Sequence, residues 1–191
     1  MRLRNSDREW GIPSIVLHWL LAVGILAMVG IGLYMVEMPN SMAKLRMYAL
    51  HKSIGLTILA LVVLRLAWRL YAGAPAPEPG TPRWQQHAAT ATHWMLYGLM
   101  LLMPVSGWVF NSASNFPLQW FGLFNLPALV QPDPELKDLA RAVHRWGYYL
   151  ICALVLVHAG AAIKHHVFNR DRTLLRMLGI RGRPDTPGDT R

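Results

Sequence analysis

Cysteine is nearly absent from this chain of 191 residues, in which Cys152 is the only one. A single thiol cannot form a disulfide within the chain, and it has no partner for a CxxC metal or redox motif. Cys152 is therefore expected to be a small apolar side chain inside a helix. A disulfide framework and a cysteine-based metal site are both excluded.

The chain also lacks a signal-peptide cleavage site. The charged start, MRLRNSDREWG, is followed by an apolar run, but no small-residue cleavage motif comes after that run. We therefore expect the first apolar run to be retained as a membrane anchor.

Apolar residues, by contrast, are abundant. They make up 53% of the sequence, and the mean hydropathy is positive, which is unusual for a soluble domain of this size. About 20 residues of α-helix cross the hydrocarbon core of a bilayer, and four apolar runs reach that length: 13–36, 47–71, 88–110 and 143–168. The sequence predicts an all-α integral membrane protein, a four-helix up-and-down bundle that forms one domain over residues 1–191.

Basic residues near the ends of these runs predict the orientation, because Lys and Arg are enriched in cytoplasmic segments. They gather in the amino terminus, in the connector after the second helix and in the tail 169–191. These residues are Arg2, Arg4, Arg8, Arg69, Arg83, Arg170, Arg172, Arg176, Arg181 and Arg183. Both termini are expected in the cytoplasm. The net charge of +9 then reflects topology and anionic lipid head groups, and nucleic acid is not expected as a partner.

The segment 111–142 is expected on the opposite side of the membrane. It carries three acidic residues and the stretch NFPLQWFGLFNLP, which is too apolar for a simple linker. We expect it to lie in the membrane interface over the outer end of the bundle, or else to dock a partner.

Histidines occupy matching depths in the predicted helices. His144 and His158 are fourteen residues apart, a spacing of almost four helical turns and about 21 Å, so they share one face at two levels. Applied to the other helices, the same spacing places a histidine, an arginine or a glycine at each of the two levels. The outer level contains His51, His144, Gly32 and Gly107, and the inner level contains His18, His93, His158 and Arg65.

Two histidines and two glycines at one level suit a flat macrocycle whose metal takes one imidazole on each side. Haem iron accepts two such ligands, and glycine leaves room for the ring edge. Zinc usually takes three or four ligands at one point. A single histidine would more often be an interhelical hydrogen bonder or an interface residue, and a haem-free metal carrier is a further alternative. Several at matched depths favour haem, since ionisable groups inside a membrane are generally functional.

Four motifs in these helices carry a resemblance to a known family. They are LHWL, LHKSIG, THWMLYGLMLLMPVSGW and VHRWGYYLICALVLVHAGAAIKHHVFNRDRTLLRML. Over nearly its whole length the chain resembles the bacterial cytochrome b561 family, and within it the di-haem, quinone-linked type that oxidises superoxide. The resemblance implies two b-type haems in a four-helix bundle of the inner membrane. It also implies a ubiquinone site near the cytoplasmic haem and electron passage between superoxide and quinone.

Transferred to this sequence, the resemblance assigns His51 and His144 to the iron of the outer haem, in agreement with their depths. For the inner haem it favours His18 with His158, which leaves His93 and His165 for the quinone site. Depth alone does not choose between His93 and His158 as the inner ligand.

Three further roles follow as expectations. His165 would donate a proton to reduced quinone, or would simply lie at the lipid interface beside His166. Arg65 would pair with a haem propionate, or would anchor its helix at the interface. Lys52 and Arg145 would hold propionates or attract superoxide. His87 is expected on the surface of the connector before the third helix.

The function predicted from the sequence is that of a superoxide:ubiquinone oxidoreductase with two haem b groups and ubiquinone as bound substrate. It would work in the bacterial inner membrane with superoxide or another small one-electron donor. The alternative is the cytochrome b electron-transfer subunit of a larger membrane dehydrogenase or hydrogenase, in which segment 111–142 docks a soluble redox partner.

Overall fold

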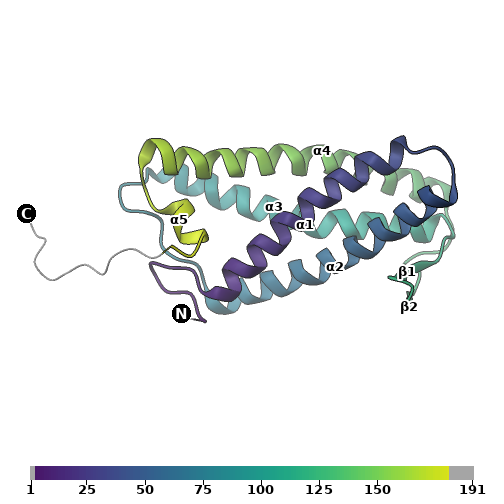
Figure 1. The fold of residues 1–191 in the computed structure, drawn as a ribbon, viewed down its shortest axis with the longest axis horizontal. Helices are drawn as coiled ribbons and strands as arrows, with labels where there is room; N and C mark the ends of the chain where they lie inside the picture. The colour runs from purple at the N-terminus through teal and green to yellow at the C-terminus, as the bar shows by residue number, and fades with distance from the viewer. Residues whose placement is uncertain (1–2, 181–191) are drawn as a thin grey trace, which may run out of the picture.

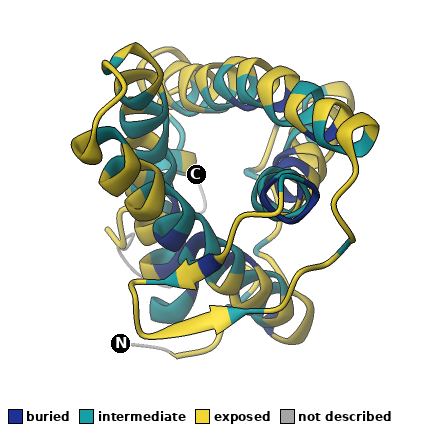
Figure 2. Cartoon of the chain, turned by 90° about the vertical axis from the view of Figure 1, so that its right-hand side faces the viewer, coloured by how far each residue is buried: buried dark blue, intermediate teal, exposed yellow. Residues whose placement is uncertain are grey.

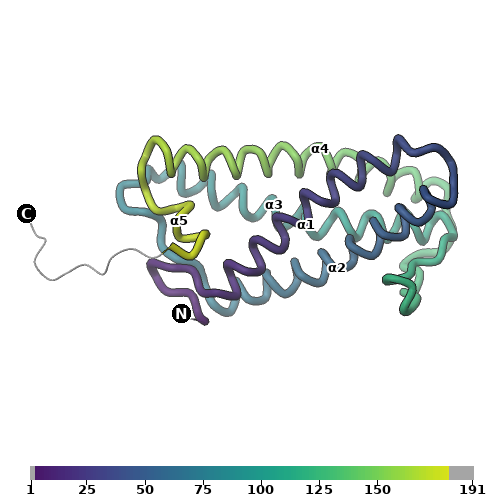
Figure 3. The backbone as a smooth tube through the Cα atoms, in the orientation of Figure 1, coloured from purple at the N-terminus to yellow at the C-terminus, as the bar shows by residue number. Residues whose placement is uncertain are grey.

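Four long α-helices make up most of the structure, a computed structural model that describes residues 3–180. They are α1 (Ile12–Glu37), α2 (Met42–Ala72), α3 (Arg83–Ala113) and α4 (Pro134–Lys164), and they run alternately up and down the bundle (Figures 1 and 3). Each is long and apolar enough to cross a membrane. The predicted all-α four-helix membrane bundle is confirmed.

Smaller elements lie at the two ends of the bundle. An antiparallel hairpin of β1 (Leu118–Trp120) and β2 (Phe124–Leu126) connects α3 to α4. After α4 the chain forms one π-helical turn, η1 (His165–Asn169), and a short helix, α5 (Thr173–Met177). We call the end with the β-hairpin the hairpin end. The opposite end, which holds the amino-terminal segment, the α2–α3 connector and α5, is called the cap end (Figure 1).

Helices α2, α3 and α4 begin five to nine residues earlier than the apolar runs that predict them, at 42, 83 and 134 instead of 47, 88 and 143. The Ser41 side chain accepts a hydrogen bond from the backbone N–H of Lys44 and caps α2, and Asp133 caps α4 in the same way. Helix α4 therefore starts at Pro134, and 134–142 is helical, not part of a loop. Helix α3 starts at Arg83, so His87 lies on an exposed face of this helix, not in the connector as predicted. Charged or polar side chains interrupt each of these first turns, so the continuous apolar runs begin only after them.

Consecutive helices pack against each other, α1 on α2, α2 on α3 and α3 on α4. The buried core between them is apolar and includes Leu21, Ile58, Val62, Leu96 and Ile151. The outward faces are apolar too, yet exposed, as the yellow positions along the helices in Figure 2 show. Exposed apolar surface of this extent is stable only in contact with lipid.

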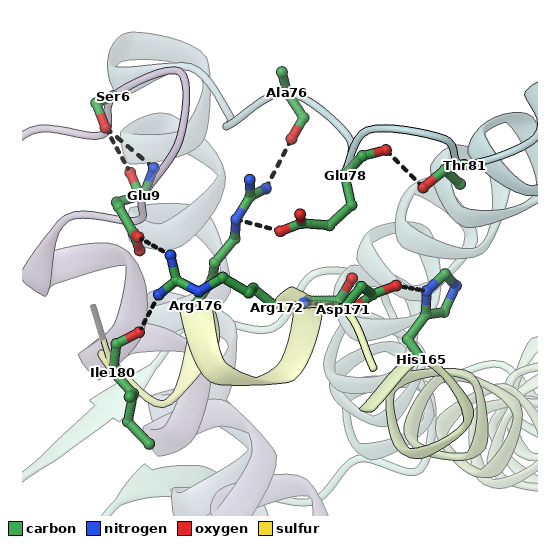
Figure 4. A network of polar contacts seen from close by, with 11 residues as sticks. Ser6, Glu9, Ala76, Glu78, Thr81, His165, Asp171, Arg172, Arg176 and Ile180 are labelled. Carbon is green, nitrogen blue, oxygen red and sulfur yellow. Dashed lines mark hydrogen bonds and ion pairs between the residues drawn. The ribbon is translucent and has the colours of Figure 1, made fainter. Parts of the chain in front are cut away.

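Ion pairs and hydrogen bonds tie three separate segments together at the cap end (Figure 4). Arg172 forms an ion pair with Glu9 at 3.1 Å, and Arg176 forms one with Glu78 at 2.7 Å. Trp19 donates its indole N–H to the carbonyl of Met177. The three basic segments predicted to lie together therefore do so, apart from Arg2, Arg181 and Arg183, which are outside the described residues.

Arg176 provides a test of this network. Arg176 and Glu78 are only 12% and 13% exposed, so Arg176→Met leaves a poorly hydrated carboxylate and is expected to destabilise the cap end by about 2–3 kcal/mol. Limited proteolysis of the connector should become faster in the variant. Arg83→Met, which removes an exposed arginine at the same end, serves as the control. Equal resistance of the two variants would show that the ion pair does not stabilise the cap.

Polar contacts join α2 to the β-hairpin, to the segment just before the hairpin and to the end of α3. Trp120 donates its indole N–H to Thr57, and the backbone N–H of Phe121 donates to Ser53. Lys52 donates to the carbonyl of Pro117 at 3.2 Å and to the side chain of Asn111 at 3.0 Å. Lys52 thus fastens the hairpin to the bundle, a structural role that the sequence did not indicate.

Candidate cofactor-binding site

Two histidines face each other at the hairpin end of the bundle. The ring centres of His51 and His144 are 6.2 Å apart, and their planes are inclined by 67°. A metal-bound imidazole nitrogen lies about 2 Å from the metal and about 1.1 Å from its own ring centre, so two axial imidazoles place their centres about 6.2 Å apart. The spacing of this pair therefore fits a haem iron between the rings.

Glycines lie against both of these rings. A Cβ atom on Gly32 would be 3.6 Å from Cε1 of His51, and one on Gly107 would be 3.4 Å from Cε1 of His144. Larger side chains at these positions would occupy space beside the imidazoles. The four residues that the sequence places at the outer level are thus brought together, in an arrangement that leaves room for a macrocycle edge.

Hydrogen bonds orient His144 but not His51. Nδ1 of His144 lies 3.0 Å from both the carbonyl of Met103 and the hydroxyl of Ser106, and that hydroxyl donates to the same carbonyl. Nδ1 of His144 must then carry the proton, which leaves the Nε2 lone pair free for a metal. Nδ1 of His51 is buried and has no hydrogen-bond partner within the described part of the chain.

Three histidines meet at the second level, towards the cap end. The ring centres of His18 and His158 are 6.1 Å apart, which again fits two axial imidazoles. The ring centres of His93 and His158 are 5.3 Å apart, shorter than the separation of about 6.2 Å for two imidazoles on opposite sides of one iron. All three histidines predicted at the inner level are therefore close together, but only one of these two measured spacings suits haem.

Arg65 bridges three helices beside these histidines. Its guanidinium donates to the hydroxyl of Tyr97 on α3 and to the carbonyl of Ser14 on α1, both at 3.1 Å. The Ser14 hydroxyl in turn accepts from the indole of Trp68 and donates to Asn5. Arg65 thus belongs to an interior polar network, which is also within electrostatic reach of the histidines and able to hold an anionic group.

His165 lies at the start of η1 and contacts Asp171, a residue that the sequence analysis did not single out. Its Nδ1 contacts one carboxylate oxygen of Asp171, and the backbone carbonyl of His165 accepts from the Asp171 N–H at 3.2 Å. No hydrogen bond or ring contact joins His165 to His93 within residues 3–180. His166, the next residue, is exposed. The structure therefore shows no direct polar or ring contact, within the described residues, between the two histidines expected at the quinone site.

A membrane-embedded helical bundle with imidazole pairs at two depths defines a membrane cytochrome that transfers electrons. The sequence model of prokaryotic cytochrome b561 matches residues 9–179, and the chain belongs to this family, whose cofactor is haem b. The resemblance predicted from the motifs is confirmed.

Individual relatives extend over almost the whole chain. Cytochrome b561 homolog 2 of Escherichia coli K12 is 33% identical over 180 residues, which cover 94% of this chain and 96% of the relative. Cytochrome b561 homolog 1 of the same strain is 34% identical over 173 residues, 86% of this chain and 94% of the relative. A protein of Yersinia pestis described as a probable superoxide oxidase, CybB, is 28% identical over 175 residues, 90% of this chain and 96% of the relative.

Proposed function

We propose that this protein is a di-haem membrane cytochrome that passes electrons from superoxide to ubiquinone. The observation that carries the proposal is the pair of imidazole spacings, 6.2 Å for His51 and His144 and 6.1 Å for His18 and His158. Each pair would hold one haem b, and the two levels are separated by the fourteen residues between His144 and His158, about 21 Å along α4. Bound haem supplies one-electron redox chemistry.

The residues of the chain hold, orient and insulate these groups. The four histidines come from α1, α2 and α4, and Gly32 and Gly107 would make room for the hairpin-end haem. The Arg65 guanidinium would pair with a propionate of the cap-end haem, since it is held inside the bundle by Tyr97 and Ser14. The apolar core around Val62 keeps water away from the path between the two levels.

The overall reaction balances with superoxide as the donor. Two superoxide ions give up one electron each and become two molecules of O2, and ubiquinone takes two electrons and two protons to become ubiquinol. Superoxide as donor is supported by the relative described as a probable superoxide oxidase. The quinone would bind at the cap end near His93 and His165, and the protons would come from the cytoplasm, where the basic cap is expected in a bacterial inner membrane.

The test is quinone reduction by the isolated protein. Purified protein in lipid vesicles, supplied with enzymatically generated superoxide and a short-chain ubiquinone, is expected to form ubiquinol with no soluble partner. Addition of superoxide dismutase should stop the reaction. Absence of superoxide-dependent ubiquinol, in a preparation that shows a b-type haem spectrum, would contradict the proposal.

The hairpin favours a second candidate function. Its apolar side chains are largely exposed, with Leu123 at 72%, Phe124 at 55% and Phe121 at 49%. This surface suits a cytochrome b subunit that receives electrons from a larger dehydrogenase or hydrogenase docked at the hairpin end. Stoichiometric copurification of such a partner from solubilised membranes, lost when Leu123 and Phe124 are replaced by serine, would support this candidate.

Ser106 provides a test of the hairpin-end ligand. Ser106→Ala removes one of the two acceptors of the His144 Nδ1–H, while the carbonyl of Met103 remains. A weaker hydrogen bond makes the imidazole less basic and stabilises oxidised iron less, so the midpoint potential of this haem should rise. One neutral hydrogen bond contributes about 1 kcal/mol, which corresponds to at most about 40 mV for a one-electron couple. A redox titration followed in the visible spectrum measures the shift, and the cap-end haem is the internal control. A shift confined to the cap-end haem would show that the ligands are assigned to the wrong levels.

A further inference from the structure

The chain turns back on itself after α4 and brings a carboxylate onto His165. The π-helical turn η1 widens the end of the helix, and Arg170 follows in the left-handed conformation with φ 54°. This turn places Asp171 beside the His165 ring (Figure 4). π-Helical turns are rare and are frequently found at functional sites.

The two oxygens of Asp171 have separate partners. One oxygen accepts from the backbone N–H of Thr173 at 2.9 Å and so begins α5. The other contacts Nδ1 of His165. Because the two contacts use different oxygens, a substitution can alter the contact with histidine and keep the contact that supports the helix.

The carboxyl group of Asp171 is ionised in its contact with His165. Burial raises the pKa of Asp171, but its hydrogen bonds with His165 and Thr173 outweigh burial, and the net pKa lies below the ordinary value. A carboxylate can only accept, so the proton of the neutral imidazole must sit on Nδ1 and the lone pair on Nε2. The side-chain NH2 group of Asn169 lies 3.2 Å from Nδ1, but it is a donor and cannot bond to a protonated Nδ1. The charged carboxylate is the stronger partner and decides the tautomer.

The two arginines of the segment that follows Asp171 have other partners. Arg172 pairs with Glu9 and also donates to the carbonyl of Ile180, and Arg176 pairs with Glu78 and donates to the carbonyl of Ala76. Both Asp171 and His165 are largely shielded from solvent, with side chains 17% and 18% exposed. In this network the carboxylates of Glu9 and Glu78 pair with arginines, and the carboxylate of Asp171 contacts His165.

We propose that Asp171 is a positioning residue for proton delivery to ubiquinone, because it fixes the tautomer and the orientation of His165. This inference rests on the proposed function. In the step it supports, the Nε2–H bond of doubly protonated His165 breaks as an O–H bond forms on the reduced quinone. The imidazole then takes a new proton from water at the cap end, and Asp171 remains a carboxylate throughout. The electrons are those of two superoxide ions, as in the overall reaction.

Asp171→Asn separates the two roles of the carboxylate. An asparagine oxygen can still accept from Thr173, but the amide NH2 group now faces Nδ1 of His165 and donates to it. The imidazole is then forced into the opposite tautomer, with its proton on Nε2 and no lone pair there. We expect the kcat of superoxide-dependent ubiquinone reduction to fall about 10- to 100-fold, with little change in the KM for ubiquinone or in the haem spectrum.

A matched control removes a different carboxylate from the same network. Glu9→Gln breaks the ion pair with Arg172 and leaves Asp171 and His165 in place, so its kcat should stay within about twofold of the unchanged protein. Selective 15N labelling of histidine, with the His165 signals assigned through His165→Gln, reports the tautomer directly. The unchanged protein should show Nδ1–H, and Asp171→Asn should show Nε2–H.

Three results would overturn the inference. One is an Nε2–H tautomer of His165 in the wild-type protein, a measurement that does not depend on the folding of any variant. Another is an equal loss of kcat in Asp171→Asn and Glu9→Gln, which would make Asp171 only a support of the cap. The third is Asp171→Asn with unchanged kcat. Failure of the unchanged protein to reduce ubiquinone would instead overturn the proposed function, and the proton step with it.

Discussion

Loss of the cap-end haem, with retention of the hairpin-end haem, is the expected result of His158→Ala. The ring centre of His158 lies 6.1 Å from that of His18, which fits two imidazoles on opposite sides of one iron, whereas it lies only 5.3 Å from that of His93. Haem per chain should therefore fall to about half, because one of two bis-imidazole sites loses an axial ligand. The pyridine haemochrome assay measures this, and a redox titration shows which of the two components has disappeared.

His93→Ala is the matched control for this prediction. It removes a histidine at the same level, in ring contact with the same His158, and both haems should remain. The assignment is wrong if His93→Ala loses the cap-end haem and His158→Ala keeps it.

Gly107→Leu is expected to eliminate the other haem. A Cβ atom at Gly107 would already lie 3.4 Å from the His144 ring, and the rest of a leucine side chain would extend into the space that a macrocycle edge needs. Overpacked sites of this kind lose their ligand or distort, at a cost of about 1–3 kcal/mol or more. We expect haem per chain to fall to about half, with the hairpin-end component missing from the redox titration.

Gly98→Leu separates this steric effect from a general effect on α3. Gly98 lies on the same helix, is exposed, and has open space where its Cβ atom would be. This variant should keep both haems and the thermal stability of the unchanged protein. Full haem content in Gly107→Leu, or equal loss in both variants, would show that Gly107 does not make room for a cofactor.

The helices and the histidine pairs could be predicted from the sequence because both depend on local regularity. Apolar runs reveal spans, and the spacing of fourteen residues between His144 and His158 maps directly onto depth in a straight helix. The same regularity brings Gly32 and Gly107 to the correct level. The cytoplasmic location of both termini follows from charge alone and stays a prediction.

The remaining features depend on irregular backbone or on contacts between distant segments. The contact of Asp171 with His165 requires a π-helical turn and a left-handed Arg170. The hydrophobic periodicity of the sequence predicts neither of these backbone conformations. The role expected for Lys52, to hold a propionate or attract superoxide, stays a prediction, whereas its hydrogen bonds to Asn111 and Pro117 depend on contacts between distant segments. The early start of α4 was signalled by Asp133 followed by Pro134, a capping pattern that hydropathy does not weigh.

The two ends of the bundle differ in the order in which a ribosome supplies their parts. The hairpin rests on Lys52, Ser53 and Thr57 of α2, so its anchoring partners are made before it and it can dock while α4 is still being translated. At the cap end, Glu9 and Glu78 can form their ion pairs only once Arg172 and Arg176 have been synthesised, which is after all four spans. The ion pairs that complete the cap end can therefore form only after all four spans have been synthesised.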